Sequence, residues 1–209
     1  MRQYVFLFFG FIFKYKGLHN AIAAFAELAK IRDDVSLLIV GESSWQTPKK
    51  DSIYDRVKRI FSRELRAQFL SRREDEQYYR PLELIDQLEI RDKATVINDF
   101  VPNEDVHKYF QVSDAIVLFY ETATASGVES IAYNFNLPIV ATRVGHFPET
   151  VKDGITGYLA KSDDVASMSE TMLNIIEQPV LSENIENLSK SMSWENYAKY
   201  ICKMAKSIK

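Results

Sequence analysis

The stretch that decides the fold is Tyr4-Val-Phe-Leu-Phe-Phe-Gly10, an apolar run closed by a glycine. A run without polar alternation is typical of a strand that is buried on both faces of a parallel sheet. Because one arginine precedes it, the same segment also fits a secretory signal peptide. The apolar run is too short to span a membrane, and Lys14 and Lys16 follow it directly. We therefore favour the strand.

Strand and helix patterns alternate along the chain from this first run onward. Further short apolar runs predict strands at 36–40, 94–98, 115–118, 137–142 and 157–160. Helical spacing of apolar residues predicts helices at 18–31, 82–90, 106–110, 126–134, 165–178, 183–191 and 194–208. The alternation implies right-handed crossovers, and therefore an α/β fold with a doubly wound parallel sheet and a helical C-terminus.

Composition narrows the class of protein. The 209 residues suit one domain, 1–209. A net charge of −3 argues against a nucleic-acid partner. Cys202 is the only cysteine, which excludes a disulfide or a cysteine-based zinc cluster within one chain. The three histidines lie far apart and show no metal-ligand spacing, so we expect no metal.

Residues 42–81 interrupt the alternation. The stretch 49–80 contains ten Lys or Arg and six Asp or Glu, with a helical apolar pattern between them. One interpretation is a solvated helical excursion packed on the domain. The other is a basic amphipathic element that contacts a membrane surface or a partner. Interspersed acids favour the first interpretation.

Ligands of doubly wound sheets bind at the carboxyl ends of the strands. After the first strand comes Gly10-Phe-Ile-Phe-Lys-Tyr-Lys-Gly17. Gly10 permits a sharp turn, and Gly17 permits close approach of the backbone. Lys14 and Lys16 place two cations there, which suits a diphosphate. Neither a dinucleotide fingerprint nor a P-loop is present in the sequence.

The fourth strand is followed by a polar loop that ends in Ser126-Gly127. A helix that opens there would offer free N–H groups and its positive end to an anion. Ser126 would also suit a helix cap, with Glu129 completing a capping box. Both interpretations use the same helix end.

The fifth strand is followed by a glycine-containing loop, 144–149. His146 would titrate near neutrality if it has a functional role, although an ordinary loop histidine is the favoured interpretation. Glu149 would accept hydrogen bonds from a hydroxyl or cap a short helix.

Together these segments resemble the C-terminal, nucleotide-sugar-binding half of GT-B glycosyltransferases, in the large retaining group (group 1, family 4 type). The resemblance rests on residues 10–17, 97–102, 123–142 and 144–159. It covers residues 4–205 apart from the excursion, and the order and spacing of the motifs make it specific. It implies a Rossmann-like half of a GT-B fold.

The resemblance implies roles for individual residues. The phosphate-binding positions are Gly10, Lys14, Lys16 and the N–H groups of Ser126, Gly127 and Val128. Phe100 and Val101 would lie beside the nucleobase. Glu121 and Glu129 have the spacing of the family's two-glutamate motif, whose acids hold the sugar and the ribose. Lys16, Glu121 and Glu129 are therefore the catalytic candidates.

Four positions depart from the family pattern. Counted from the proline of Leu137-Pro138, the two acids would fall on Ala123 and Ile131, two residues beyond the visible pair. Two residues on a helix correspond to about 200°. The family's arginine and the second glycine of its Gly-Gly loop fall on Phe13 and His146. A bacterial subgroup with an Ala-Thr-x-Ser-Gly-Val segment also lacks the usual acids, and residues 123–128 are similar to it.

The implied reaction is retaining transfer of a sugar from a nucleotide diphosphate, UDP or GDP, to an acceptor hydroxyl in polysaccharide or glycan synthesis. We expect no cofactor besides the nucleotide-sugar substrate. The acceptor, a glycan or lipid-linked glycan, would be bound by an N-terminal domain that this chain lacks. The isolated domain should therefore bind a nucleotide without turnover. We expect a bacterial, cytoplasmic protein, with contact to the inner face of the membrane through 49–80 as an open alternative.

Two other functions remain open. A degenerate, non-catalytic nucleotide-binding or scaffolding domain would have the same fold. A response-regulator-like signalling domain would require acids after the first strand, and residues 10–17 contain none.

Overall fold

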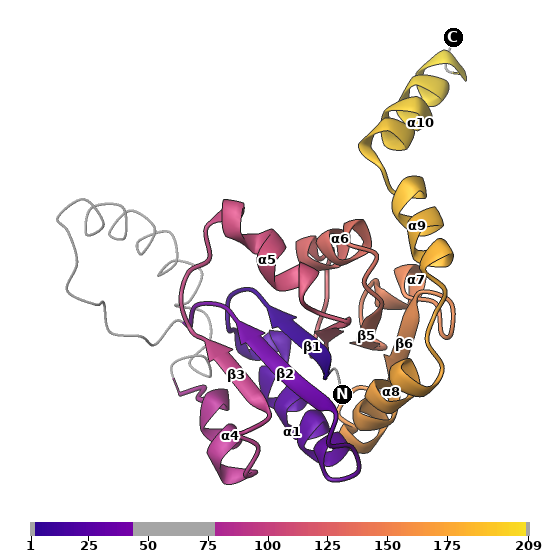
Figure 1. Cartoon of the computed structure of the whole chain (residues 1–209). Coiled ribbons are helices and arrows are strands. Elements are labelled where there is room, and N and C mark those ends of the chain that lie inside the picture. The colour runs from indigo at the N-terminus through magenta and orange to yellow at the C-terminus, as the bar shows by residue number, and fades with distance from the viewer. Residues whose placement is uncertain (1–2, 44–77, 208–209) are drawn as a thin grey trace, which may run out of the picture.

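A six-stranded parallel sheet forms the centre of the protein (Figure 1). The computed structural model describes residues 3–43 and 78–207. The strands are β1 (Tyr4–Phe9), β2 (Val35–Val40), β3 (Ala94–Ile97), β4 (Ala115–Leu118), β5 (Ile139–Thr142) and β6 (Gly157–Ala160). Their order is β3-β2-β1-β4-β5-β6. All six lie where the apolar runs predict them, so the doubly wound α/β fold is confirmed.

Strand β1 occupies the middle of the sheet. It pairs with β2 along all of its residues and with β4 at Phe6 and Leu7. Phe6, Leu7 and Phe8 are buried. Successive side chains of a strand point to opposite faces, so a strand covered on both sides needs an uninterrupted apolar run. The chain winds outward from β1 to β3 and then returns to β4, which makes the β1–β4 boundary the topological switch point.

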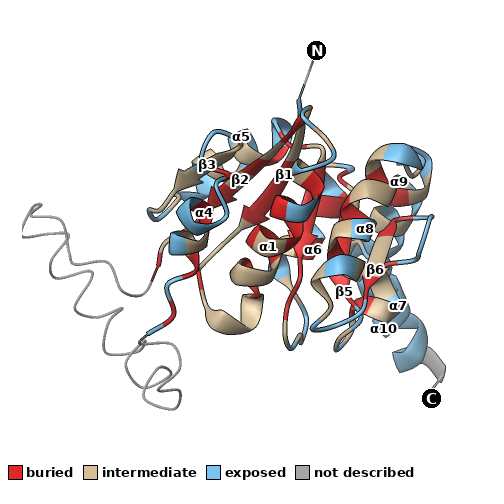
Figure 2. Cartoon of the chain, turned by 90° about the horizontal axis from the view of Figure 1, so that it is seen from below, coloured by how far each residue is buried: buried red, intermediate tan, exposed pale blue. Residues whose placement is uncertain are grey.

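Helices cover both faces of the sheet (Figures 1 and 2). One face carries α1 (Leu18–Ala29), α4 (Leu84–Gln87) and α8 (Val165–Glu177). The other carries α5 (Val106–Gln111), α6 (Gly127–Asn134) and α9 (Ser182–Ser191). The turns η1 (Lys14–Lys16), η2 (Pro81–Glu83), η3 (Asn103–Asp105) and α7 (Phe147–Thr150) complete the elements. These turns are too short to show a helical period, so the sequence did not predict most of them. The exception is η2, which falls partly within the predicted helix at 82–90.

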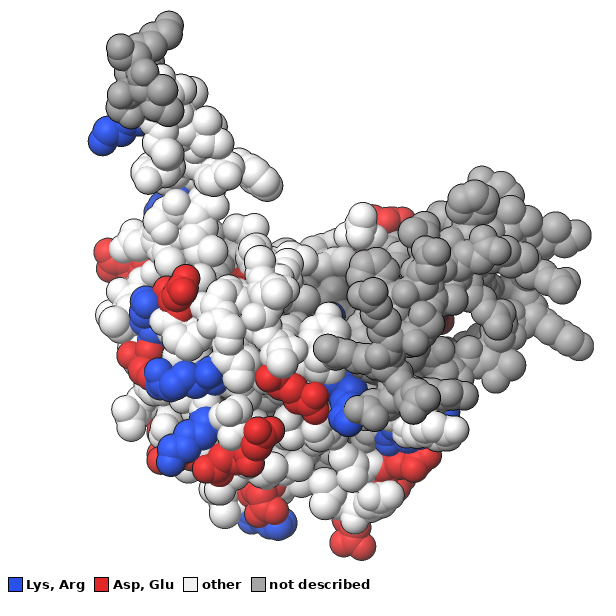
Figure 3. Space-filling view, turned by 180° about the vertical axis from the view of Figure 1, so that it is seen from behind, with Lys and Arg blue, Asp and Glu red and all other residues white. Residues whose placement is uncertain are grey.

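The last helix, α10 (Trp194–Ser207), projects from the body (Figures 1 and 3). Its residues 194–205 are all exposed, including Trp194 and Tyr197. Over the rest of the face in Figure 3, basic and acidic side chains are interspersed. Most of the predicted excursion at 42–81 lies outside the described residues, so that prediction stays open. Within residues 3–43 and 78–207, no helix combines the length and hydropathy that a membrane span requires.

Candidate phosphate-binding site

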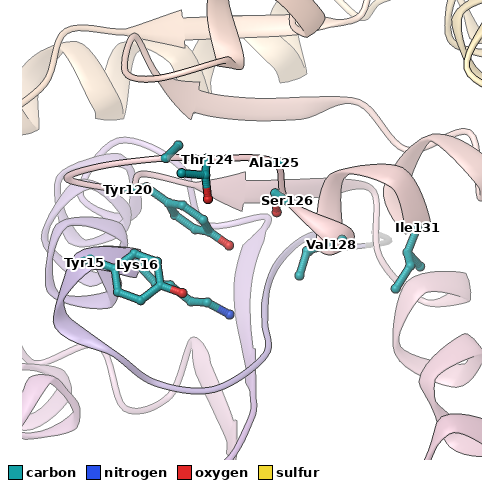
Figure 4. Close-up of a pocket in the computed structure, with 10 residues that line it drawn as sticks. Tyr15, Lys16, Tyr120, Thr124, Ala125, Ser126, Val128 and Ile131 are labelled. Carbon is teal, nitrogen blue, oxygen red and sulfur yellow. The ribbon is translucent and has the colours of Figure 1, made fainter. Parts of the chain in front are cut away.

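A pocket of about 320 Å³ opens at the switch point, beyond the carboxyl ends of β1 and β4 (Figure 4). Three segments form it: η1 after β1, the loop after β4, and the first turns of α6. Its lining consists of Tyr15, Lys16, Tyr120, Ala123, Thr124, Ala125, Ser126, Gly127, Val128 and Ile131. Among the described residues, one cation, several small residues and no carboxylate line the space.

Two glycines shape the wall that carries the cation. Gly10 has a φ of +106°, and a Cβ there would lie 2.9 Å from the Lys16 Nζ. Gly17 has a φ of +62°, and a Cβ there would lie 1.8 Å from the carbonyl oxygen of Phe119. Both conformations favour glycine. They let η1 turn back over the sheet, against the end of β4, and bring Lys16 into the pocket.

Lys16 carries the positive charge of the pocket. In Figure 4 its nitrogen and the Tyr120 hydroxyl point toward the start of α6. Burial lowers the pKa of Lys16 to about 8, because desolvation disfavours the ammonium form. An anion in the pocket would offset that desolvation and favour the charged lysine.

The start of α6 faces Lys16 across the pocket. Ser126 is the N-cap residue, in extended conformation, but its side chain makes no capping hydrogen bond. By contrast, the Asp164 carboxylate caps α8 by accepting a hydrogen bond of 2.9 Å from the Ser167 N–H. The predicted capping box of Ser126 and Glu129 is therefore wrong. The first turn of α6 keeps N–H groups and positive dipole for an external acceptor.

Glu129 lies in the first turn of α6 but is not among the described residues that line the pocket. It is only 2% exposed, and its Oε2 lies 2.5 Å from His146 Nε2. Ile131, two residues further along α6, lines the pocket instead. This agrees with the rotation of about 200° for two helical residues. His146 was expected to be an ordinary loop histidine, but in the structure it pairs with the buried carboxylate of Glu129.

Glu121 points away from the pocket. Its Oε1 lies 3.5 Å from Nε2 of His19, whose Nδ1 lies 2.8 Å from the Tyr79 hydroxyl. Burial, together with the nearby charge of Lys14, lowers the pKa of His19. Lys14 and Glu121 therefore belong to a polar cluster beside α1, and neither lines the pocket.

The two candidates for nucleobase contact follow β3, at the edge of the sheet. Phe100 is 60% exposed, whereas Val101 is partly buried against the α5–α6 side of the core. Neither lines the pocket, so their role stays a prediction. Among the predicted residues, Lys16, Ser126, Gly127 and Val128 line the pocket, and Gly10 lies beside Lys16. Tyr15 and Tyr120 also line it but were not predicted, although both lie in segments that follow strands.

A lysine and an uncapped helix end that face one pocket at the switch point of a doubly wound sheet have a geometry suited to a phosphate-bearing ligand. In the described part of the chain, no group of three or more His, Cys, Asp or Glu could hold a metal ion. Residues 1–199 match the family "Glycosyl transferases group 1". The chain therefore belongs to this family, and it corresponds to the C-terminal, donor-binding domain of the GT-B fold.

The relatives are distant. N-acetyl-alpha-D-glucosaminyl L-malate synthase of Bacillus anthracis is 24% identical over 116 residues, which are 56% of this chain and 30% of that protein. The C-terminal domain of the group 1 glycosyl transferase LpcC from Francisella tularensis superposes with a TM-score of 0.67 at 17% identity, covering 92% of this chain and 87% of that one. Anabaena HepE in complex with UDP and glucose gives a TM-score of 0.69 at 16% identity, and the match covers 99% of this chain and 49% of HepE. The chain thus spans about half of HepE and less than a third of the curated relative.

Proposed function

We propose that this chain binds the nucleotide-diphosphate sugar of a retaining glycosyltransferase and places the diphosphate between Lys16 and the start of α6. The observation that carries the proposal is that these two positive groups face one pocket, and that the part of its lining described by the structure contains no carboxylate. The UDP bound in HepE, a protein with the same fold, supports a uridine nucleotide as the first ligand to test.

The chemistry follows from the charge of the leaving group. As the bond between the anomeric carbon and the diphosphate oxygen breaks, negative charge grows on the diphosphate. The Lys16 ammonium and the N–H groups of the first turn of α6 are preorganised to stabilise that charge, typically by several kcal/mol. We expect this positive charge to serve where other transferases use a metal ion. The sugar passes to an acceptor hydroxyl with retention of configuration, in polysaccharide or glycan synthesis.

The rest of the active site would come from the acceptor-binding half of a GT-B enzyme. The 209-residue chain should therefore bind a donor nucleotide but transfer no sugar alone. A second candidate is a non-catalytic nucleotide-binding domain. It is favoured by Ala123 and Ile131, which line the pocket at the positions where the resemblance places two acids. Sugar transfer by the chain together with an acceptor-binding domain would distinguish the two.

Calorimetric titration of the chain with UDP and GDP tests the proposal. We expect binding of at least one nucleotide. Lys16→Ala should weaken it by about 1.5–3 kcal/mol, the range for a hydrogen bond to a charged group. Lys161→Ala, at an exposed lysine that is not among the described residues of the pocket lining, is the matched control and should leave the affinity unchanged. Absence of binding at millimolar nucleotide would refute the donor site.

A further inference from the structure

A buried carboxylate lies in the first turn of α6, outside the described lining of the pocket. Glu129 is the third residue of α6, and its side chain is 3% exposed. Its Oε2 pairs with Nε2 of His146 at 2.5 Å. Within the described residues, Oε1 of Glu129 and Nδ1 of His146 have no hydrogen-bond partner. His146 is therefore the one side chain in that part of the structure that holds this carboxylate.

This carboxylate would oppose an anion in the pocket. A charge away from water is poorly screened, so its repulsion extends farther than at the surface. Burial raises the pKa of Tyr120, which lines the pocket, to about 12, and the charges of Tyr15 and Glu129 add smaller increases. A diphosphate at the start of α6 would meet the same negative potential.

His146 is built into a rigid loop. Gly145 before it has a φ of +53°, and a Cβ there would lie 1.9 Å from the carbonyl oxygen of Ala123. The imidazole packs against Phe147, with ring centroids 4.7 Å apart, and Phe147 is fully buried. The β5–α7 loop thus presents the imidazole to Glu129 from beneath the loop that lines the pocket.

We propose that His146 is a positioning residue for the phosphate site: its hydrogen bond holds the Glu129 carboxylate away from the ligand, so that the start of α6 can accept a diphosphate. The inference rests on the proposed function and deepens it. It assigns Glu129 no contact with the ligand, in contrast to the role that the two-glutamate spacing suggests. The two roles predict opposite effects of removing the carboxylate charge.

The test is UDP titration of the wild-type chain, Glu129→Gln, His146→Gln and the double variant. His146→Gln should weaken UDP binding about tenfold, because the Glu129 carboxylate is no longer held by the imidazole and its charge repels the diphosphate. Glu129→Gln should bind UDP at least as tightly as the wild type. The double variant should return to within about twofold of the wild type, since the carboxylate that His146 holds is gone. Uridine, which carries no phosphate, should bind to His146→Gln and to the wild type alike.

His107→Gln is the matched control, because His107 is exposed on α5 and remote from the pocket lining. Weaker UDP binding by Glu129→Gln would show that Glu129 contacts the ligand and would overturn the inference. Equal losses for UDP and uridine in His146→Gln, without rescue by Glu129→Gln, would mean a purely structural role and would overturn it too. If His146→Gln does not fold, the sign of the Glu129→Gln effect decides.

The proposed function and this inference fail in different ways. A wild-type chain that binds neither UDP nor GDP refutes both. A wild-type chain that binds UDP, with His146→Gln unchanged, refutes only the role of His146.

Discussion

Lys16 is the residue on which the phosphate site depends. From the sequence, both Lys14 and Lys16 were expected to bind phosphate, and only Lys16 was a catalytic candidate. Both lysines lie in η1, a 3₁₀ turn, where residues two apart differ by about 240° in direction. Such a turn is too short to be recognised by its period, so the sequence did not show that Lys14 would lie outside the pocket lining.

The lowered pKa of Lys16, about 8, predicts how stability and UDP affinity change with pH. An unfolded lysine titrates near 10.4, so the charged Lys16 opposes folding below pH 8, and this destabilisation is relieved as the pH rises between the two values. The affinity for a diphosphate should show the opposite pH dependence and fall as the pH rises, because the diphosphate requires the ammonium form of Lys16. UDP affinity should fall by up to about eightfold between pH 7.5 and 9.

The measurement is calorimetric titration across that range, beside Lys16→Arg, whose side chain stays charged throughout. The arginine variant should show no such loss. A parallel decrease in both proteins would contradict the assignment of the titration to Lys16.

The longer helices and the strands were predicted well from the sequence, whereas the contacts between elements were predicted poorly. Continuous apolar runs identify the strands of a parallel sheet because both of its faces are covered. The pairing of Glu129 with His146 joins residues 17 apart in sequence, and no local spacing encodes it. Free N–H groups at the start of α6 were one interpretation of the sequence, but Ser126-x-x-Glu129 also has the pattern of a capping box, and the sequence did not decide between the two.

A substitution at Gly127, the first residue of α6, should affect ligand binding and folding stability differently. A Cβ at Gly127 would meet no atom within 4 Å, but it would extend toward the proposed phosphate position. Gly127→Ala should leave the free energy of unfolding unchanged or raise it by up to about 1 kcal/mol, while UDP affinity falls at least tenfold. Denaturant unfolding and calorimetry measure the two effects.

Gly145→Ala is the control for stability. A Cβ there would lie 1.9 Å from the Ala123 carbonyl oxygen, so this variant should be destabilised. If Gly127→Ala keeps the wild-type affinity for UDP, the diphosphate does not lie against the first turn of α6.

At the scale of the whole molecule, the sheet and its two helical layers form the body, and α10 stands apart from it (Figure 1). Residues 194–205 are exposed, with Trp194 at 85%. The helix was predicted correctly from its amphipathic pattern. That pattern did not predict that its apolar side would be exposed within the described part of the chain.

Removal of residues 194–209 should therefore leave the body intact. We expect the midpoint of thermal unfolding to shift by less than about 4 °C, the shift that a change of roughly 1 kcal/mol would cause in a domain of this size. UDP affinity should also be retained. A shorter chain that unfolds much earlier would show that α10 packs on the body in solution. Circular dichroism melting curves of both chains make the comparison.

The central claim is that the start of α6 and Lys16 hold a diphosphate. Titration of the ¹⁵N-labelled chain with UDP, followed by amide NMR, tests it most directly. The account predicts the largest shifts at the amides of Gly127, Val128 and Lys16, and their loss when uridine replaces UDP. Shifts confined to segments remote from the pocket, or equal shifts with uridine, would contradict it.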